Sequence, residues 1–160
     1  MVRRYILISS ILLALATVCS TSFIHLSFMR CISVGMARVP LRPATRVILA
    51  VLILFVAHFT QIAIYAIAFG VGHQVLNLGS FSGEGVQTAL DYFYFSAVSF
   101  TSLGIGDIFP KNHLRLLTGV EALNGLLLIA WSGAFLFAMM NQLWDWPSCA
   151  EPDDASTRKK

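Results

Sequence analysis

Residues 94–110 read Tyr-Phe-Ser-Ala-Val-Ser-Phe-Thr-Ser-Leu-Gly-Ile-Gly-Asp-Ile-Phe-Pro, and this stretch decides the fold. The apolar segment that leads into it, residues 86–100, would be about 22 Å long as a helix, too short to cross a bilayer core of about 30 Å. In the residues that follow, Gly104 and Gly106 can adopt positive φ angles and turn successive carbonyls to one side. We therefore expect a re-entrant helix and an extended loop, held at membrane depth by their neighbours.

The composition indicates a membrane protein. Of the 160 residues, 57% are hydrophobic and 12% are charged, whereas an ordinary soluble domain has about 25% charged residues. The formal charge of +3 is too small and too scattered for nucleic-acid binding. The cysteines have no CxxC spacing, and the sequence contains no catalytic or nucleotide-binding motif, so neither an enzyme nor a cofactor is expected.

Three segments are long and apolar enough to span a bilayer: 5–29, 47–69 and 116–143. Arg3 and Arg4 precede the first segment, so a cleaved signal peptide competes with a retained helix. The length of the apolar run and the lack of a clean cleavage site favour the retained helix. We expect a multi-pass protein of a prokaryotic-type cytoplasmic membrane.

The connector between the first two spans, residues 30–46, is basic and has no acidic residue; its arginines are Arg30, Arg38, Arg42 and Arg46. Pro40 and Pro43 should prevent a helix from running through it. Because cytoplasmic loops are enriched in arginine and lysine, this connector is expected in the cytoplasm. The N-terminus and the 94–110 loop would then lie outside, and the C-terminus inside.

Three polar side chains lie at helical spacing on the second span: His58, Gln61 and Tyr65. They can share one face, which should be turned toward protein and away from lipid. Hydrogen bonding between helices is the favoured interpretation, and a proton-sensing His58 is the alternative.

Residues 86–143 resemble the pore region of the potassium-channel family, and residues 47–69 resemble its outer helix more weakly. The filter of that family reads Thr-x-Gly-Tyr-Gly-Asp. This chain has Thr101-Ser102-Leu103-Gly104-Ile105-Gly106-Asp107, with the run 95–100 before it and Ile108-Phe109-Pro110 after it. The resemblance implies an all-α membrane protein: a two-helix pore module with a re-entrant pore helix and filter, plus one extra N-terminal transmembrane helix.

Three parts are then expected. Residues 1–46 form the N-terminal helix and basic connector, residues 47–144 the pore domain and residues 145–160 a polar cytoplasmic tail. The pore domain would comprise an outer helix (47–69), a pore helix (86–100), a filter (101–107) and an inner helix (116–143).

The implied function is that of a subunit of a passive, potassium-selective channel. Each chain supplies one loop, so a homotetramer around a central pore is expected. Backbone oxygens would coordinate K⁺ in place of its water, and they belong to Ser102, Leu103, Gly104 and Ile105. Two alternatives stay open: a weakly selective monovalent cation channel that also passes Na⁺, and a non-conducting membrane scaffold with a pore-like loop.

The filter region departs from the family pattern at three positions. Ile105 stands in place of tyrosine, and Phe95 stands in place of the tryptophan that would receive the tyrosine hydroxyl. The resemblance therefore implies an apolar contact between Ile105 and Phe95. Val98 stands where some members have a glutamate that pairs with the filter aspartate, so Asp107 needs another partner. Tyr94 and a backbone amide are the candidates.

The last span carries three candidate pore residues. Gly125 lies ten residues after Arg115, where the family's inner helix bends, which implies a gating hinge. Close helix packing is the alternative role, and residues 132–134 are a second candidate bend. Asn124 is expected to line the cavity. Glu121 has three possible roles: facing the cavity, hydrogen bonding behind the filter, or holding helices together as a protonated or paired carboxylate.

Overall fold

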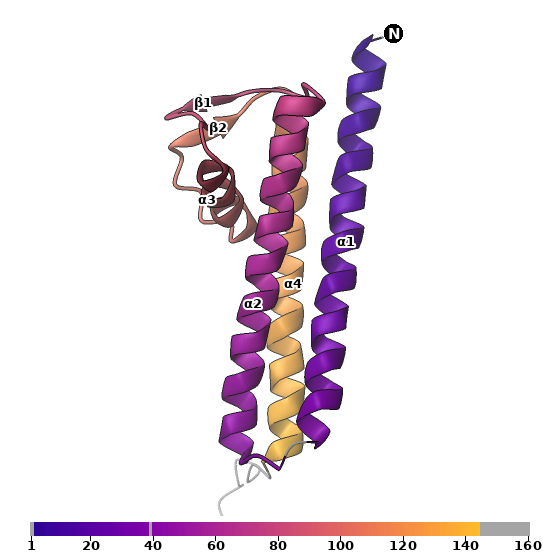
Figure 1. The fold of residues 1–160 in the computed structure, drawn as a ribbon, viewed down its shortest axis with the longest axis vertical. Coiled ribbons are helices and arrows are strands. Elements are labelled where there is room, and N and C mark those ends of the chain that lie inside the picture. Colours follow the sequence, from indigo (N-terminus) through magenta and orange to yellow (C-terminus); the bar gives the residue numbers. More distant parts are fainter. Residues whose placement is uncertain (1, 39, 145–160) are drawn as a thin grey trace, which may run out of the picture.

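Figure 1 shows the computed structural model, which describes residues 2–38 and 40–144. Its elements follow in the order α1 (Val2–Arg38), α2 (Pro43–Gly70), a π-helical turn η1 (Val71–Val75), β1 (Phe81–Gly83), α3 (Ala89–Phe100), β2 (Ile108–Pro110) and α4 (Leu114–Leu143). The expected polar tail, residues 145–160, lies outside the described residues. Within the described chain the fold is that of an all-α membrane protein, as predicted.

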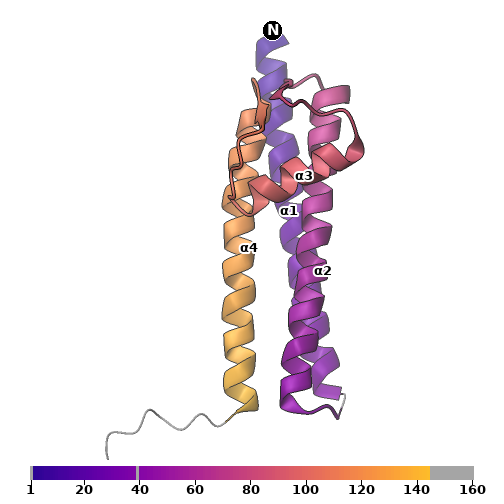
Figure 2. The ribbon, with the colours of Figure 1, turned by 90° about the vertical axis from the view of Figure 1, so that its left-hand side faces the viewer.

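Three helical stretches are long and apolar enough to cross a membrane: Arg4–Met36, Pro43–Val75 and Leu114–Leu143. They lie side by side, and α1 packs against α2 and α4 on the side away from α3 (Figures 1 and 2). The short helix α3 and the two strands lie at the end of the bundle where α1 begins. The connector between α1 and α2 lies at the opposite end, beside the end of α4. The extra N-terminal helix is thus an integral part of the bundle.

The predicted bounds of the connector, residues 30–46, are wrong. Helix α1 does not end at residue 29 but continues to Arg38, because no proline interrupts it before Pro40. Pro43 is the first residue of α2, and proline is tolerated in the first turn because its missing N–H would have no helical partner there. Arg38 therefore lies on α1 and Arg46 on the first turn of α2.

Helix α3 begins at Ala89 and not at residue 86 as predicted, because a capping box places its N-cap at Thr88. Thr88 Oγ1 accepts a hydrogen bond from Asp91 N (3.3 Å), and Asp91 Oδ2 accepts one from Thr88 N (2.7 Å). Asp91 Oδ2 also accepts from Gln87 N, and these backbone donors, Gln87 first, lower the pKa of Asp91. The Asp91 carboxylate, which would be costly in lipid, thus caps the helix.

A short two-stranded sheet joins the chain segments that precede α3 and follow the loop. Strands β1 and β2 pair antiparallel, with Phe81 opposite Pro110 and Gly83 opposite Ile108. Gly83 has a φ of +91°, and a Cβ there would lie 2.0 Å from the carbonyl oxygen of Asp107. No side chain fits at this approach, so a glycine lets β1 lie directly against the end of the loop.

A buried ring of hydrogen bonds joins the three long helices. Gln61 Nε2 lies 3.0 Å from His25 Nδ1, and Gln61 Oε1 lies 3.0 Å from His58 Nδ1. Ser132 Oγ completes the ring, 3.0 Å from His58 Nε2 and 3.4 Å from His25 Nε2. The donors and acceptors match around the ring when both histidines are neutral, each with one N–H. Helix–helix hydrogen bonding by His58 and Gln61 is therefore confirmed.

A second set of buried hydrogen bonds joins the same three helices at Asn124. Asn124 Nδ2 donates to Thr21 Oγ1 (2.9 Å) and to Tyr65 Oη (3.0 Å). All three side chains are buried, and they come from α4, α1 and α2. The prediction that Asn124 lines the pore cavity is therefore wrong. The side chain is turned inward because α1, which lies outside the family pattern, offers it a hydroxyl.

Candidate functional site

The loop after α3 has the alternating backbone expected of a carbonyl-lined filter. Positive φ angles occur at Ser102 (55°), Gly104 (61°) and Gly106 (82°), and not at Leu103 or Ile105 between them. The glycines adopt this conformation at little steric cost. Alternation of this kind directs successive carbonyl oxygens toward one side of an extended chain.

The positive φ of Ser102 also closes the end of α3. Leu103 N donates to Val98 O (3.0 Å) and Ser102 N donates to Ser99 O (3.0 Å). These two bonds are the Schellman cap, with Ser102 at the left-handed position that glycine usually occupies. A non-glycine residue in that conformation costs about 1–2 kcal/mol. Val98 thus supports the loop through its carbonyl.

The outer end of the loop is held by Asp107. Tyr94 Oη donates to Asp107 Oδ2 (2.6 Å) and Ile108 N donates to Asp107 Oδ1 (2.9 Å). The tyrosine hydroxyl is the main cause of a lowered Asp107 pKa, and the same bond raises the pKa of Tyr94. Both predicted partners of Asp107 are therefore present. Glu84 N also donates to Asp107 O (3.0 Å), and this bond joins the end of β1 to the loop.

Glu121 lies behind α3, where its side chain is fully buried. Ser96 Oγ lies 2.5 Å from Glu121 Oε1 and 2.8 Å from the carbonyl oxygen of Ile62. A hydroxyl has one hydrogen, so both contacts are hydrogen bonds only when Glu121 is protonated and donates to Ser96, which donates to Ile62. Of the three roles considered for Glu121, the structure favours a neutral acid that holds α2, α3 and α4 together.

Gly125 marks the closest approach of α4 to α3. A Cβ at this position would lie 2.1 Å from the carbonyl oxygen of Phe100 and 3.0 Å from its ring. Phe100 is the last residue of α3 and is buried against α2 as well, with its ring centroid 6.5 Å from that of Tyr65. Close packing is therefore a definite role of Gly125. The gating hinge stays a prediction.

Residues 52–142 match the model of a protein family described as Ion channel. The match covers more than half of the 160 residues. The chain belongs to this ion-channel family. Its members have two-helix, potassium-channel-like pore domains, and the matched residues run from α2 through α4. No curated protein and no solved structure matches the chain significantly.

The Phe95 side chain of the channel lies in an aromatic cluster. Its ring packs edge-on against Phe69 and Phe81, with centroid distances of 5.0 and 5.1 Å. Phe81 lies on β1 and covers Phe95, so the Phe95 ring is buried within its own chain. The side chain of Ile105 is 55% exposed. Within the single chain Phe95 thus packs in an aromatic cluster, and the apolar contact between Ile105 and Phe95 stays a prediction.

Sequence reasoning missed several residues that position the channel's loop. Ser96 and Phe100 connect α3 to its neighbours, and His25 and Thr21 connect α1 to the pore region. A signal for the last two was present, because Thr17, Thr21 and His25 recur every four residues in a span without charged side chains. In the structure all three are buried.

Replacing Tyr94 with phenylalanine removes the hydroxyl that holds Asp107, so the Asp107 pKa should rise toward its ordinary value of 3.8. A lowered pKa contributes stability above pH 3.8 that is lost as the pH falls through the lowered value. Ion flux through the native channel should therefore be constant between about pH 7 and 5 at the outer face. In the variant, flux should begin to fall at a higher pH than in the native channel.

Flux from liposomes, measured as the external pH is lowered, provides the comparison. Tyr92→Phe is the matched control, since the Tyr92 hydroxyl bonds to His73 and Gln74. Identical acid profiles for Tyr94→Phe and Tyr92→Phe would show that the bond to Asp107 does not hold the loop.

Proposed function

We propose that this channel conducts K⁺ passively and selectively through a pore on the axis of a homotetramer in a prokaryotic-type cytoplasmic membrane. The observation that carries the proposal is the alternating backbone of residues 102–106, placed directly after a re-entrant helix. Such a backbone offers carbonyl oxygens in a row, and a row of carbonyls can replace the hydration shell of K⁺. The oxygens involved belong to Ser102, Leu103, Gly104 and Ile105.

One chain cannot complete this coordination. A dehydrated cation needs oxygens on several sides, and each chain supplies one loop. Leu103 is 67% exposed and Ile105 is 55% exposed in the single chain. Two large apolar side chains on a loop at membrane depth need protein contacts, which neighbouring copies would provide. These exposures support an assembly of identical subunits, and four loops make the filter of the family that the chain resembles.

The alternative, a weakly selective cation channel, is favoured by one observation. Ile105 has no hydroxyl to anchor the filter, and Phe95, which packs on Phe69 and Phe81, has no ring N–H to receive one. A filter without this anchor can widen and accept Na⁺. The anchor at Asp107, with Tyr94 and Ile108 as donors, supports the selective function instead.

The test is K⁺ flux into liposomes from the purified native chain, with and without Ba²⁺, compared with Gly104→Ala. Gly104 has a φ of +61°, and an added Cβ would meet nothing within 4 Å in the chain. The substitution therefore acts through backbone conformation, and we expect it to abolish flux. The matched control is Gly119→Ala, at an equally open site with no positive φ, which should conduct like the native channel.

A native chain that passes no K⁺ would contradict the proposal and favour the scaffold. Native-like flux from Gly104→Ala would show that the alternating backbone is not the conduction path.

A further inference from the structure

The end of the bundle that is predicted to be cytoplasmic, opposite α3 and the strands, contains a pocket. It has a volume of about 240 Å³ and lies between the last turns of α1, the first turn of α2 and the last turns of α4. Its walls are largely apolar and include Ile32, Phe135 and Met139. The family match begins at residue 52, so the α1 wall of this pocket is a feature of the extra helix.

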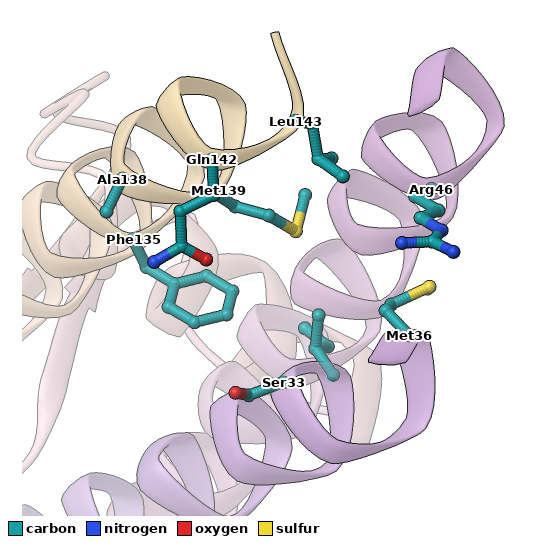
Figure 3. Close-up of a pocket in the computed structure, with 9 residues that line it drawn as sticks. Ser33, Met36, Arg46, Phe135, Ala138, Met139, Gln142 and Leu143 are labelled. Atoms are coloured by element: carbon teal, nitrogen blue, oxygen red, sulfur yellow. The ribbon is translucent and has the colours of Figure 1, made fainter. Parts of the chain in front are cut away.

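The pocket has one charged side chain and two polar ones. Arg46 lies across it from Gln142 and Phe135, and Ser33 stands on the α1 wall (Figure 3). The arginine offers N–H donors in a planar fork that matches phosphate oxygens. The serine hydroxyl and the glutamine amide add further donors. The polar groups thus suit an oxyanion, and the apolar walls suit a hydrocarbon chain.

Among the residues that the structure describes, the charged side chains at this end of the bundle are all basic. Arg30, Arg38, Arg42 and Arg46 all lie near it, whereas the acidic residues of the described chain lie elsewhere. Glu84, Asp91 and Asp107 are at the opposite end, around the two strands and the loop, and Glu121 is buried behind α3. A positive potential therefore surrounds the pocket on the side where the inner leaflet carries anionic lipid.

We propose that this pocket binds the phosphate headgroup of an anionic phospholipid from the cytoplasmic leaflet. Arg46 contacts the phosphate, Ser33 and Gln142 donate to its oxygens, and the start of one acyl chain lies against Phe135 and Met139. The volume is below the roughly 300–1,000 Å³ of a site that encloses a whole drug-sized ligand. It fits a headgroup and the first part of a chain, and the rest of the lipid stays in the bilayer. The bound lipid joins α1 to the pore helices α2 and α4.

Native mass spectrometry of the purified protein tests this, by counting lipids bound per chain as phosphatidylglycerol or phosphatidylcholine is added. Phosphatidylglycerol should bind the native chain more tightly than phosphatidylcholine. Arg46→Gln should weaken phosphatidylglycerol binding at least tenfold, since a hydrogen bond to a charged group contributes about 1.5–3 kcal/mol. Arg46→Lys should restore only part of the binding, because it keeps the charge and loses the planar fork.

The matched control is Arg38→Gln, which removes an exposed arginine at the same end that does not line the pocket. It should leave binding within about twofold of native, because Arg38 makes no contact with a headgroup held in the pocket. Ala138→Trp, on the α4 wall, fills the pocket without changing charge and should also weaken binding. This second variant keeps the test decisive if Arg46→Gln folds poorly.

Three outcomes would overturn the site. Equal losses for Arg38→Gln and Arg46→Gln would mean diffuse attraction to basic residues. Undiminished binding by Ala138→Trp would mean that the lipid does not enter the pocket. Displacement of phosphatidylglycerol by inorganic phosphate at millimolar concentration would mean that the pocket is a free-phosphate site.

Discussion

Gly125→Ala is expected to destabilise the channel more than any other glycine-to-alanine change in α4. The new Cβ would lie 2.1 Å from the backbone oxygen of Phe100, and backbone cannot move aside as a flexible side chain can. Overpacking of this kind costs about 1–3 kcal/mol and sometimes more. The end of α3, where the filter begins, would have to shift away from α4.

Thermal unfolding in detergent provides the measurement, with Gly133→Ala as the control. Gly133 lies on the same helix, and a Cβ there meets nothing within 4 Å. Gly133→Ala should therefore gain about 0.5–1 kcal/mol from the better helix former. If Gly125→Ala melts like the native channel but changes the open probability, Gly125 acts as the hinge and close packing is not its main role.

Glu121→Ala is expected to cost about 2–5 kcal/mol, as for other large buried side chains cut to alanine. The change leaves a void behind α3 and removes the donor to Ser96, which itself holds the carbonyl of Ile62. Because these contacts join α2, α3 and α4, the filter should lose its support from behind. Both the melting temperature and the ion flux should fall.

Glu121→Gln separates this role from that of a cavity charge. A glutamine amide donates to Ser96 as a protonated carboxyl does and has nearly the same shape. We expect melting and conductance close to native for this variant. An ionised Glu121 that attracts cations would behave differently, because its neutralisation would lower conductance while leaving the melting temperature in place. That result would contradict the protonated acid.

The sequence predicted the features that depend on local pattern. Apolar length indicated the three spans, and the short run before Thr101 indicated the re-entrant helix. Gly104 and Gly106 adopt the positive φ angles that their place in the filter requires. The partner of Asp107 could also be predicted, because Val98 in place of a glutamate left Tyr94 and a backbone amide as the candidates.

The features that were missed depend on contacts between distant segments. The face that Asn124 presents to its neighbours was fixed by α1, which supplies Thr21 from 103 residues away. Three-residue strands such as β1 and β2 carry too little pattern to be recognised, and their pairing also decided where Phe95 packs. The length of α1 was underestimated because the arginines suggested a loop from residue 30, whereas arginine is a good helix former and Arg30 and Arg38 both lie on α1.

The bi-ionic reversal potential tests the central claim most directly. The purified native channel is placed in a planar bilayer with KCl on one side and an equal concentration of NaCl on the other. Carbonyls that replace the water of K⁺ at Ser102, Leu103, Gly104 and Ile105 predict a reversal potential far from zero, in the direction of K⁺ permeation. Reversal at zero would mean equal permeability for the two ions, and would contradict a potassium-selective filter.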